Sequence, residues 1–472
     1  MDPHPLILGG TLRKTSSVIP VHNPYSCILI AEVCAAGPDE AEEALILAEQ
    51  GAQKMAATPA HARSAMLHRL AGLMQEEHEA LTDLIVREGG KVRKLASAEV
   101  TRAIGTIRVS AEEAVRIPDT MVPMDGYPAG EGRIALLMRV PVGVVLAITP
   151  FNLPLNQICH KAGPALAAGN ACIIKPPSAT PLTALFFGDL LLRAGFPGEA
   201  VSVIPCRPDI AERMATDRRV SCLSFTGSPA VGWHLRRVTN ARHVTLELGG
   251  NAAVIVHDDA DPVLAAARIV EGAYSHAGQV CISVQRVFVH RAVSDLLTAE
   301  IVRGCAALSV GDPEDSGTDV GPMITPEKAL GARDLISDAA SGGAVVLCGG
   351  QMKGHLLIPT VLAGTTPEMK VNSEEVFAPI LTITPYDTFE EAVKMVNNSR
   401  FGLQAGVFTK DISRAMHACR SICCGAVLIN DIPTFRIDSM PYGGVKESGI
   451  GREGPLWAIR EMTEERLIII RP

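Results

Sequence analysis

The stretch that decides the fold begins with the apolar run Val142-Gly143-Val144-Val145-Leu146-Ala147-Ile148. Further short apolar runs follow, each separated from the next by a segment of helical character. They cover Ala171 to Ile174, Ala200 to Ile204, Val220 to Phe225 and His243 to Leu248. Strands separated by helices of about ten or more residues imply a parallel sheet with crossover connections. The alternation resumes with Ala252 to Val256 and Arg286 to Val289. We therefore predict an α/β fold.

The segments on either side of this series have other patterns. Residues 38 to 115 read as helices, and Asp39 is placed to cap the first of them. A connector rich in proline and glycine then leads from Pro118 to Gly132 into a strand-like run, Ile134 to Val140. The chain ends with another strand-like run, Arg466 to Ile470. Because this last run has no partner nearby in sequence, it is a candidate for pairing with another subunit.

The composition excludes several classes of protein. A chain of 472 residues is long enough for two or three domains, and 47% apolar with 20% charged residues is typical of a globular protein. A formal net charge of −8 provides no basic surface for nucleic acid. The first residues lack the pattern of a signal peptide, and no apolar run reaches membrane-spanning length. We therefore expect a cytoplasmic protein that binds neither nucleic acid nor membranes.

The 12 cysteines have no regular spacing and indicate reduced thiols. Cys419, Cys423 and Cys424 cluster, but no second ligand pair accompanies them at zinc-finger spacing, so no metal site is expected. Cys281 stands apart because it follows Gly278 and Gln279 in a polar, turn-prone run. A thiol there can be partly exposed and stabilised as a thiolate, which suits a nucleophile. The alternative is a small buried hydrophobe, the usual role of a free cysteine.

A second chemical feature lies upstream. Glu247 is a lone acid inside the apolar run Thr245 to Leu248, and Gly249 and Gly250 follow it and leave room around it. Such an acid is a candidate general base.

Three loops follow predicted strands, at the edge where open parallel sheets bind ligands. Asn152 projects an amide from a loop fixed by two prolines, Lys175 and Ser178 follow the next strand, and Phe225 to Gly232 opens a helix. Lysine and serine side chains suit a ribose or phosphate, and a helix N-terminus suits a pyrophosphate. The alternatives are an ordinary turn asparagine and solvated loops, since the G-x-G-x-x-G fingerprint is absent.

Together these residues resemble those of the NAD(P)-dependent aldehyde dehydrogenases. The motifs that carry the resemblance span nearly the whole chain in one order: Thr149 to Pro154, Lys175 to Ser178, Phe225 to Gly232, Leu246 to Gly250, Gly278 to Cys281, Glu374 to Pro379 and Met440 to Lys446. The resemblance implies two Rossmann-like parallel-sheet domains and a β-arm for oligomerisation, in a homodimer or homotetramer. The expected cofactor-binding domain covers residues 1–118 and 141–248, the catalytic domain 249–452, and the arm 119–140 and 453–472.

The resemblance also implies the reaction. Cys281 would attack the carbonyl carbon of an aldehyde, and the Asn152 amide with the Cys281 backbone N–H would hold the oxyanion. After hydride transfer leaves a thioester, Glu247 would activate the water that hydrolyses it to a carboxylate. Relatives that transfer the acyl group to coenzyme A generally lack this acid, so hydrolysis is favoured.

The resemblance implies NADP or NAD as the cofactor. The expected cofactor-binding residues are Ile148, Thr149, Pro150, Lys175, Ser178, Phe225, Gly227, Ser228, Val231, Leu248, Glu375 and Phe377. Lys175 and Glu375 would hold ribose hydroxyls. Many NAD-preferring relatives carry a glutamate at the position of Ser178, which would repel a 2′-phosphate, so we expect NADP to be accepted.

The expected substrate-binding residues are Arg102, His160, Val280, Ile282 and Arg436. His160 replaces a tryptophan that is usual in enzymes for apolar aldehydes, and an arginine in a narrow pocket suits an anion. Alternatively, Arg102 could pair with Glu99 or Glu112, and Arg436 with Asp438.

The subgroup with the most similar motifs includes lactaldehyde and phosphonoacetaldehyde dehydrogenases. The phosphonate enzymes carry an arginine immediately before the nucleophile, where this chain has Val280. Lactaldehyde, semialdehyde, sulfonate and phosphonate aldehydes therefore all remain possible substrates. The alternatives to this function are a coenzyme A-acylating dehydrogenase and a catalytically silent structural relative. The silent relative is disfavoured because Cys281 and Glu247 are both present.

Overall fold

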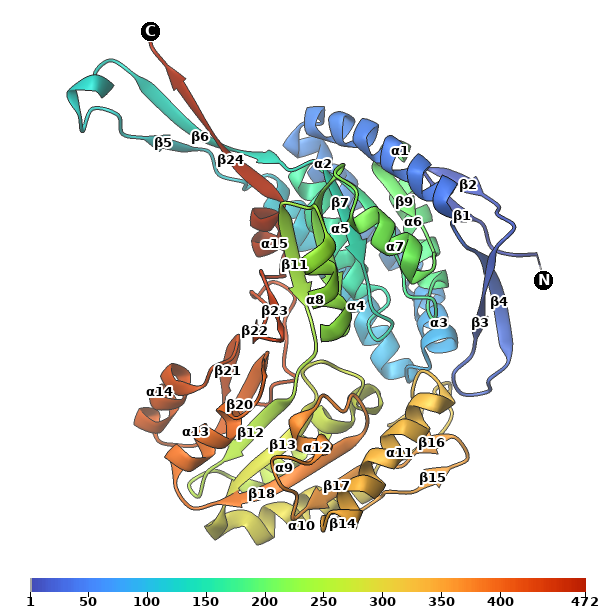
Figure 1. Ribbon diagram of the computed structural model, residues 1–472, viewed down its shortest axis with the longest axis vertical. Helices are drawn as coiled ribbons and strands as arrows, with labels where there is room; N and C mark the ends of the chain where they lie inside the picture. The colour runs from blue at the N-terminus through green and yellow to red at the C-terminus, as the bar shows by residue number, and fades with distance from the viewer. Residues whose placement is uncertain (1) are drawn as a thin grey trace.

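The computed structural model describes residues 2–472 and contains two layered α/β units with a projecting arm (Figure 1). The first unit has an eight-stranded sheet in the order β2-β1-β9-β8-β7-β10-β11-β23. Its strands are β1 (Leu6–Leu8), β2 (Thr11–Arg13), β7 (Val144–Ile148), β8 (Ala171–Lys175), β9 (Val201–Val203), β10 (Val220–Thr226), β11 (His243–Glu247) and β23 (Gly449–Ile450). The five strands from β7 to β11 are parallel, which confirms the α/β prediction.

Helices cover both faces of this sheet, so its strands read as continuous apolar runs. They are α1 (Pro38–Ala57), α2 (Ala60–Glu76), α3 (His78–Gly89), α4 (Arg93–Ala114), α5 (Asn156–Ala168), α6 (Leu182–Arg193), α7 (Pro208–Ala215), α8 (Pro229–Val238) and α15 (Pro455–Glu461). Helix α5 lies between α4 and the sheet, and all its residues are buried. Its alanines and Gly163 permit this close approach on every side.

The second unit has a seven-stranded sheet in the order β14-β17-β18-β13-β12-β20-β21. Its strands are β12 (Ala252–Val256), β13 (Val284–His290), β14 (Val345–Cys348), β17 (Thr360–Ala363), β18 (Ile380–Tyr386), β20 (Gln404–Phe408) and β21 (Ala426–Ile429). All but β14 run parallel. The helices of this unit are α9 (Pro262–Tyr274), α10 (Ser294–Ala306), α11 (Pro326–Ser341), α12 (Lys370–Ser373), α13 (Phe389–Asn397) and α14 (Ile412–Ser421).

Smaller elements complete the two units. Three pairs of short strands are β3 (Val18–His22) with β4 (Leu29–Cys34), β15 (Met352–Lys353) with β16 (Leu356–Leu357), and β19 (Phe401–Gly402) with β22 (Val445–Lys446). The 3₁₀ turns are η1 (Pro128–Gly130), η2 (Gly198–Ala200), η3 (Ser275–Gly278) and η4 (Arg291–Val293).

The arm is a three-stranded antiparallel sheet of β5 (Thr120–Val122), β6 (Ile134–Pro141) and β24 (Thr463–Ile470), and it projects away from both units (Figure 1). The last strand therefore starts before Arg466, where the sequence placed its beginning. Residues 453–462, which the sequence assigned to the arm, lie elsewhere: they contain α15, which packs against α5. Its apolar side chains Ile459 and Met462 join the core of the first unit, which is why this segment does not extend with the arm.

Two general properties concern the chain as a whole. Among residues 2–472, no helix is both long and apolar enough to cross a membrane. All 12 cysteines carry free thiols.

Candidate active site

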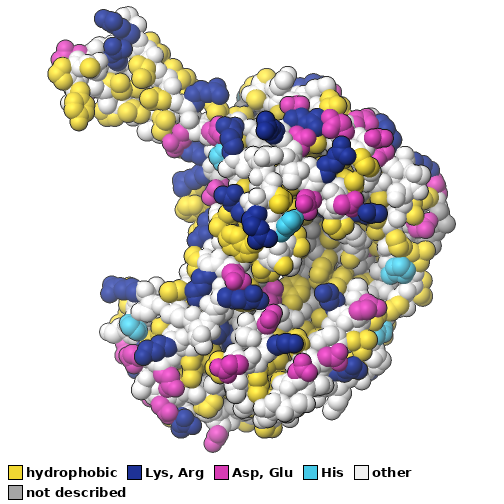
Figure 2. Space-filling model, viewed as in Figure 1, with side chains coloured by type: hydrophobic (Ala, Val, Ile, Leu, Met, Phe, Trp, Pro, Cys, Tyr) yellow, Lys and Arg dark blue, Asp and Glu magenta, His cyan; other side chains and the backbone are white. Residues whose placement is uncertain are grey.

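A cavity of about 1110 Å³ lies between the two units, visible as the hollow in Figure 2. The carboxyl ends of β7, β8, β10 and β11 open onto it from one side, and the segments that precede β12 and β13 open onto it from the other. Cys281, Glu247 and Asn152 all line it. The structure therefore brings the three predicted catalytic residues to one space.

Cys281 is presented by a tight turn. His276 and Ala277 have left-handed backbone conformations with φ of 48° and 54°, and Gly278 continues the turn with φ of 69°. A Cβ at Gly278 would collide with the Ala378 carbonyl, so only glycine fits there. The turn leaves Cys281 half-buried, with Sγ 2.8 Å from the Tyr442 hydroxyl oxygen.

This environment does not stabilise a thiolate. Burial raises the pKa of the Cys281 thiol to about 12, although the hydrogen bond with Tyr442 opposes the rise. The sequence prediction of a partly exposed thiol agrees with the half-buried side chain, but the predicted thiolate is wrong for this conformation. The reason is the largely apolar surroundings, which the local sequence does not reveal.

Asn152 is locked in place from both ends. Its side-chain Nδ2 donates to the Gln279 carbonyl at 2.8 Å, and its own carbonyl accepts from Lys91 Nζ at 2.6 Å. Lys91 is ion-paired with Glu99, and both are buried. Glu99 also accepts from the backbone N–H groups that begin α5, at 3.0 and 3.1 Å. The Asn152 amide is therefore positioned beside the segment that carries the thiol.

Glu247 ends β11, and its carboxylate is buried without any hydrogen-bond partner for either oxygen. Burial raises its pKa well above the usual value, and the nearby Glu453 carboxylate adds to the rise. The two glycines after it leave space for neighbouring groups. A Cβ at Gly249 would collide with the Glu375 carboxylate, and a Cβ at Gly250 would collide with the Cys281 carbonyl. Glu375 in turn accepts from the Gly250 N–H at 2.9 Å.

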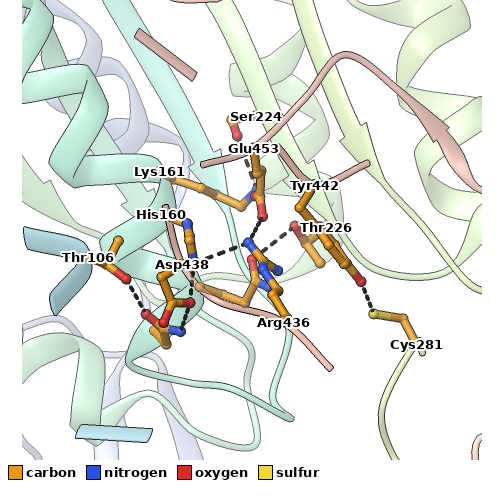
Figure 3. Close-up of polar contacts among 12 residues, drawn as sticks. Thr106, His160, Lys161, Ser224, Thr226, Cys281, Arg436, Asp438, Tyr442 and Glu453 are labelled. Carbon is orange, nitrogen blue, oxygen red and sulfur yellow. Dashed lines mark hydrogen bonds and ion pairs between the residues drawn. The ribbon is translucent and has the colours of Figure 1, made fainter. Parts of the chain in front are cut away.

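Arg436 reaches the same cavity through a network of buried charges (Figure 3). Its Nη2 lies 3.1 Å from His160 Nε2 and 3.5 Å from Glu453 Oε2, and its guanidinium carbon lies 3.7 Å from the centre of the Tyr442 ring. Its Nε has no hydrogen-bond partner. Glu453 is held by Lys161 at 2.8 Å.

Asp438 organises the other predicted substrate residues. It accepts two hydrogen bonds from Arg102, at 3.0 and 2.8 Å, and lies 2.9 Å from His160 Nε2. These partners hold the pKa of Asp438 well below its usual range despite its burial. Arg102 thus pairs with neither Glu99 nor Glu112, and the nearest ion pair of Arg436 is with Glu453.

All the predicted site residues line the cavity except His160. It is buried on α5 behind Arg436 and Asp438. Its placement in the substrate tunnel is therefore corrected: it orients the groups that face the tunnel. Burial and the Arg436 charge lower its pKa, so the imidazole is neutral.

Sequence reasoning missed Lys91, Asp438, Tyr442, Glu453 and Lys161 as members of the site. Tyr442 stands inside a motif that was recognised, so its hydroxyl could have been found there. The sequence suggests Asp438 only as a possible partner of Arg436, whereas it holds Arg102, 336 residues away. Lys91 is 61 residues from Asn152, Lys161 is 292 residues from Glu453, and Glu453 is 17 residues from Arg436, so no local pattern marks these contacts.

The other half of the cavity has the features that a nicotinamide dinucleotide needs. It is lined by the predicted cofactor residues Ile148, Thr149, Pro150, Lys175, Ser178, Phe225, Gly227, Ser228, Val231, Leu248, Glu375 and Phe377. The Thr149 hydroxyl is buried without a partner. Burial lowers the pKa of Lys175 and raises that of Glu375 to about 7. Helix α8 begins at the cavity with Ser228 before its first turn, so its N-terminal N–H groups suit phosphates.

Comparisons with known proteins agree with this arrangement. A family model described as "Aldehyde dehydrogenase family" matches residues 12–468. The chain is 41% identical over 466 residues to a 3-sulfolactaldehyde dehydrogenase of Priestia aryabhattai, covering 98% of this chain and 97% of that protein. It is similar, at a TM-score of 0.97 and 35% identity, to aldehyde dehydrogenase 21 of Physcomitrella patens in complex with the reaction product succinate, covering 100% of this chain and 99% of that one. The same values apply to the NADP-dependent glyceraldehyde-3-phosphate dehydrogenase of Bacillus halodurans complexed with NADP.

Proposed function

Since the chain belongs to the aldehyde dehydrogenase family, we propose that it oxidises a small anionic or highly polar aldehyde to the carboxylate with NADP or NAD. It is an oxidoreductase that acts on aldehydes. The observation that carries the substrate class is Arg436, a buried guanidinium that lines the cavity beside Tyr442 with its Nε unpartnered. A buried donor without a partner is costly unless a ligand supplies the acceptor. The sulfolactaldehyde relative and the succinate-bound neighbour support an anionic substrate.

The chemistry proposed for this chain starts at Cys281. Its neutral thiol has to lose a proton as Sγ bonds to the carbonyl carbon, and Glu247, with two unpartnered oxygens and a raised pKa, is the proposed acceptor. The Asn152 amide and the Cys281 backbone N–H are the donors proposed for the oxyanion. Held in advance by Lys91 and Gln279, the amide needs little reorganisation as the charge develops.

Release of the product uses the same acid. Once the acyl group is a thioester on Sγ and Glu247 has passed the first proton to solvent, Glu247 accepts a proton from water as the water oxygen bonds to the acyl carbon. The C–S bond then breaks, and the sulfur leaves as a thiolate that takes a proton to restore the thiol. Burial raises its pKa, so the Glu247 carboxylate holds a proton more tightly than an exposed carboxylate would. Glu247 therefore favours hydrolysis over transfer to coenzyme A.

The cofactor, when bound, supplies the acceptor for the hydride that leaves the substrate carbon. On this chain Lys175 and Glu375 would hold ribose hydroxyls, and the first turn of α8 would hold phosphates. Ser178 is exposed and places no carboxylate beside Lys175, so this position does not repel a 2′-phosphate. The NADP-bound neighbour supports this use.

We also propose that the arm joins copies of the chain. Its strands β5, β6 and β24 expose Met121, Leu467 and Ile469, which are 68%, 50% and 49% accessible, and the arm is the apolar projection in Figure 2. Light scattering coupled to gel filtration tests for a homodimer or homotetramer, and a charged substitution such as Leu467→Asp should yield monomers. A cytoplasmic location stays a prediction that cell fractionation would test.

A substrate panel tests the function. Sulfoacetaldehyde, phosphonoacetaldehyde, succinic semialdehyde, lactaldehyde, glyceraldehyde 3-phosphate and hexanal are each assayed with NAD and with NADP, and the acid product is measured with and without coenzyme A. We expect the highest kcat/KM for an aldehyde with an anionic or hydroxylated tail and a carboxylate product in both arms. A preference for hexanal would overturn the substrate class, and an acyl-coenzyme A product would favour the acylating alternative.

A further inference from the structure

The carboxyl edge of the second sheet carries a cluster of histidines that the aldehyde chemistry does not use. Strands β12 and β13 are parallel with Val256 opposite Val289, so the next residues, His257 and His290, stand side by side where the two strands end. On the next strand, β18, Tyr386 pairs with His290. Three neighbouring strands thus deliver two imidazoles and a phenol to one point. This is the edge at which open parallel sheets bind ligands.

The point is far from the reacting groups. Cys281 precedes β13 and His290 ends it, so the seven-residue strand separates them by about 20 Å. A separate cavity of about 400 Å³ opens there, between the sheet and helices α13 and α14. His257, His290 and His417 line it, together with Asp387 and Glu390.

The geometry within the cluster is close. His257, Asp258 and His290 each offer a ligand atom, and these atoms all lie within 4.8 Å of one another. The rings of His257 and His290 meet edge to face with centroids 4.8 Å apart. His290 is half-buried and Asp258 exposed, so small side-chain rotations suffice to bring the three atoms to a shared ligand. His290 then gives up a long, 3.3 Å hydrogen bond from the Ala292 N–H.

His257 is oriented as metal-binding histidines usually are. The Tyr386 hydroxyl lies 2.7 Å from His257 Nδ1 and 3.3 Å from the Val256 carbonyl oxygen, so it holds the ring through Nδ1. The other ring nitrogen, Nε2, lies 3.3 Å from a carboxylate oxygen of Asp258. Nε2 and this oxygen are therefore the two atoms that would face a bound cation. A second residue that fixes the ring through its other nitrogen is the usual support of a metal ligand.

The surrounding charges permit a cation. The two nearby arginines are already engaged: Arg291 with Asp387 at 2.7 Å, and Arg414 with Asp259 at 3.0 Å. Within residues 2–472, Asp258 pairs only with His257, and Glu390 lines the cavity.

We propose that His257, His290 and Asp258 form a second ligand site, specific for a divalent transition-metal ion of the kind that imidazole prefers, with Zn²⁺ as its occupant. Two nitrogens and one carboxylate oxygen are a common ligand set for zinc, with Zn–N bonds of about 2.0–2.1 Å. His417, from α14, lines the same cavity and is a candidate for a fourth ligand. The ion ties the ends of β12 and β13 together, so it stabilises the second unit without entering the aldehyde reaction.

The test measures bound metal on the full-length protein. After treatment with a chelator, the wild type and variants are dialysed against Zn²⁺, and zinc per chain is determined together with the midpoint of thermal unfolding with and without Zn²⁺. His290→Asn and Asp258→Asn change accessible side chains and should fold. His61→Asn is the matched control, because His61 is exposed on α2, in the other unit.

We expect the wild type and His61→Asn to bind one more zinc per chain than His290→Asn or Asp258→Asn, and to gain thermal stability that these two variants lose. Cys281→Ser should keep the extra zinc, which separates this site from the reactive thiol. Equal zinc content in the wild type, His290→Asn and Asp258→Asn would overturn the proposal, and so would loss of the extra zinc in Cys281→Ser.

Discussion

The two parallel sheets meet the central cavity with opposite edges. The first presents its carboxyl edge, so the predicted cofactor residues Thr149, Lys175 and Ser228 lie at or just after the ends of strands. The second presents its amino edge, so Cys281 precedes β13 and the glycines after Glu247 precede β12. The carboxyl edge of the second sheet faces away and carries the His257 cluster instead. A loop at the carboxyl edge of a parallel sheet therefore predicts a place in the central cavity only once the position of the other sheet is known.

The two units also contribute different reactive and charged groups. The first sheet contributes Glu247, a buried acid without a partner, whereas the loops of the second unit contribute a neutral thiol and the Arg436 network. Neither half has both a nucleophile and a base. The reaction therefore depends on the two units being held together, and each of the following changes removes a contribution of one side.

The largest effect is expected from the second unit. Cys281→Ser replaces the thiol with a weaker nucleophile, and aldehyde oxidation should fall by on the order of 10⁴-fold or more. Cys419→Ser, on the exposed surface of α14, should retain full activity. Both are measured as kcat/KM with the best aldehyde of the panel. Substantial activity in Cys281→Ser would mean that another group attacks the carbonyl.

A change in the first unit should cause a smaller loss of activity, accompanied by a trapped intermediate. Glu247→Gln removes the base for both proton transfers, so turnover should drop about 10²–10⁴-fold. Because the thiol can also release its proton to solvent, whereas the attack of water needs the base, hydrolysis is slowed more than acylation and a thioester should accumulate on Cys281. Since burial raises the pKa of Glu247, the acid is protonated at low pH, and wild-type kcat should fall as pH decreases through that raised value. The variant should lack this dependence.

Mass spectrometry of the protein after a single turnover detects the acyl group. A pH series of kcat detects the fall in activity at low pH. The matched control is Glu76→Gln, an exposed change at the end of α2. Unchanged turnover without acyl-enzyme in Glu247→Gln would contradict the role of this acid.

The sequence predicts the strands and the motif residues of the site better than the contacts that support them. The alternating apolar runs predicted the five parallel strands β7 to β11 of the first sheet and strands β12 and β13 of the second, because strands buried on both faces must be apolar throughout. The other five strands of the second sheet were not predicted. The motifs beside Cys281, Glu247 and Asn152 predicted which residues meet. The support of those residues was not predictable: Lys91 holds Asn152, and Asp438 holds Arg102 across more than 300 residues of chain. Such pairs are made by tertiary packing and leave no periodic signal.

A third prediction concerns the substrate end of the cavity. Arg102 lines it and donates to Asp438 from Nε and Nη2. Arg102→Ala removes a positive charge from the cavity and should raise KM about tenfold for anionic aldehydes, with little change for hexanal. Arg108→Ala, on the exposed face of the same helix, is the control. Equal losses for charged and neutral aldehydes would remove the case for anion selection by Arg102.

The smallest loss of activity is expected from removing the hydrogen bond between Tyr442 and the Cys281 thiol. The Tyr442 hydroxyl lies 2.8 Å from Cys281 Sγ and lowers the pKa of a thiol that burial raises to about 12. Tyr442→Phe keeps the ring under Arg436 but removes this hydrogen bond, which contributes about 1 kcal/mol, so kcat/KM should fall about fivefold. Because the thiol pKa then rises further, the activity remaining should shift to higher pH, whereas a purely structural role would lower activity equally at every pH. Tyr127→Phe, exposed beside the arm, controls for loss of a hydroxyl elsewhere. A pH profile of kcat/KM that is unchanged in shape would show that the hydroxyl packs against the sulfur without tuning its ionisation.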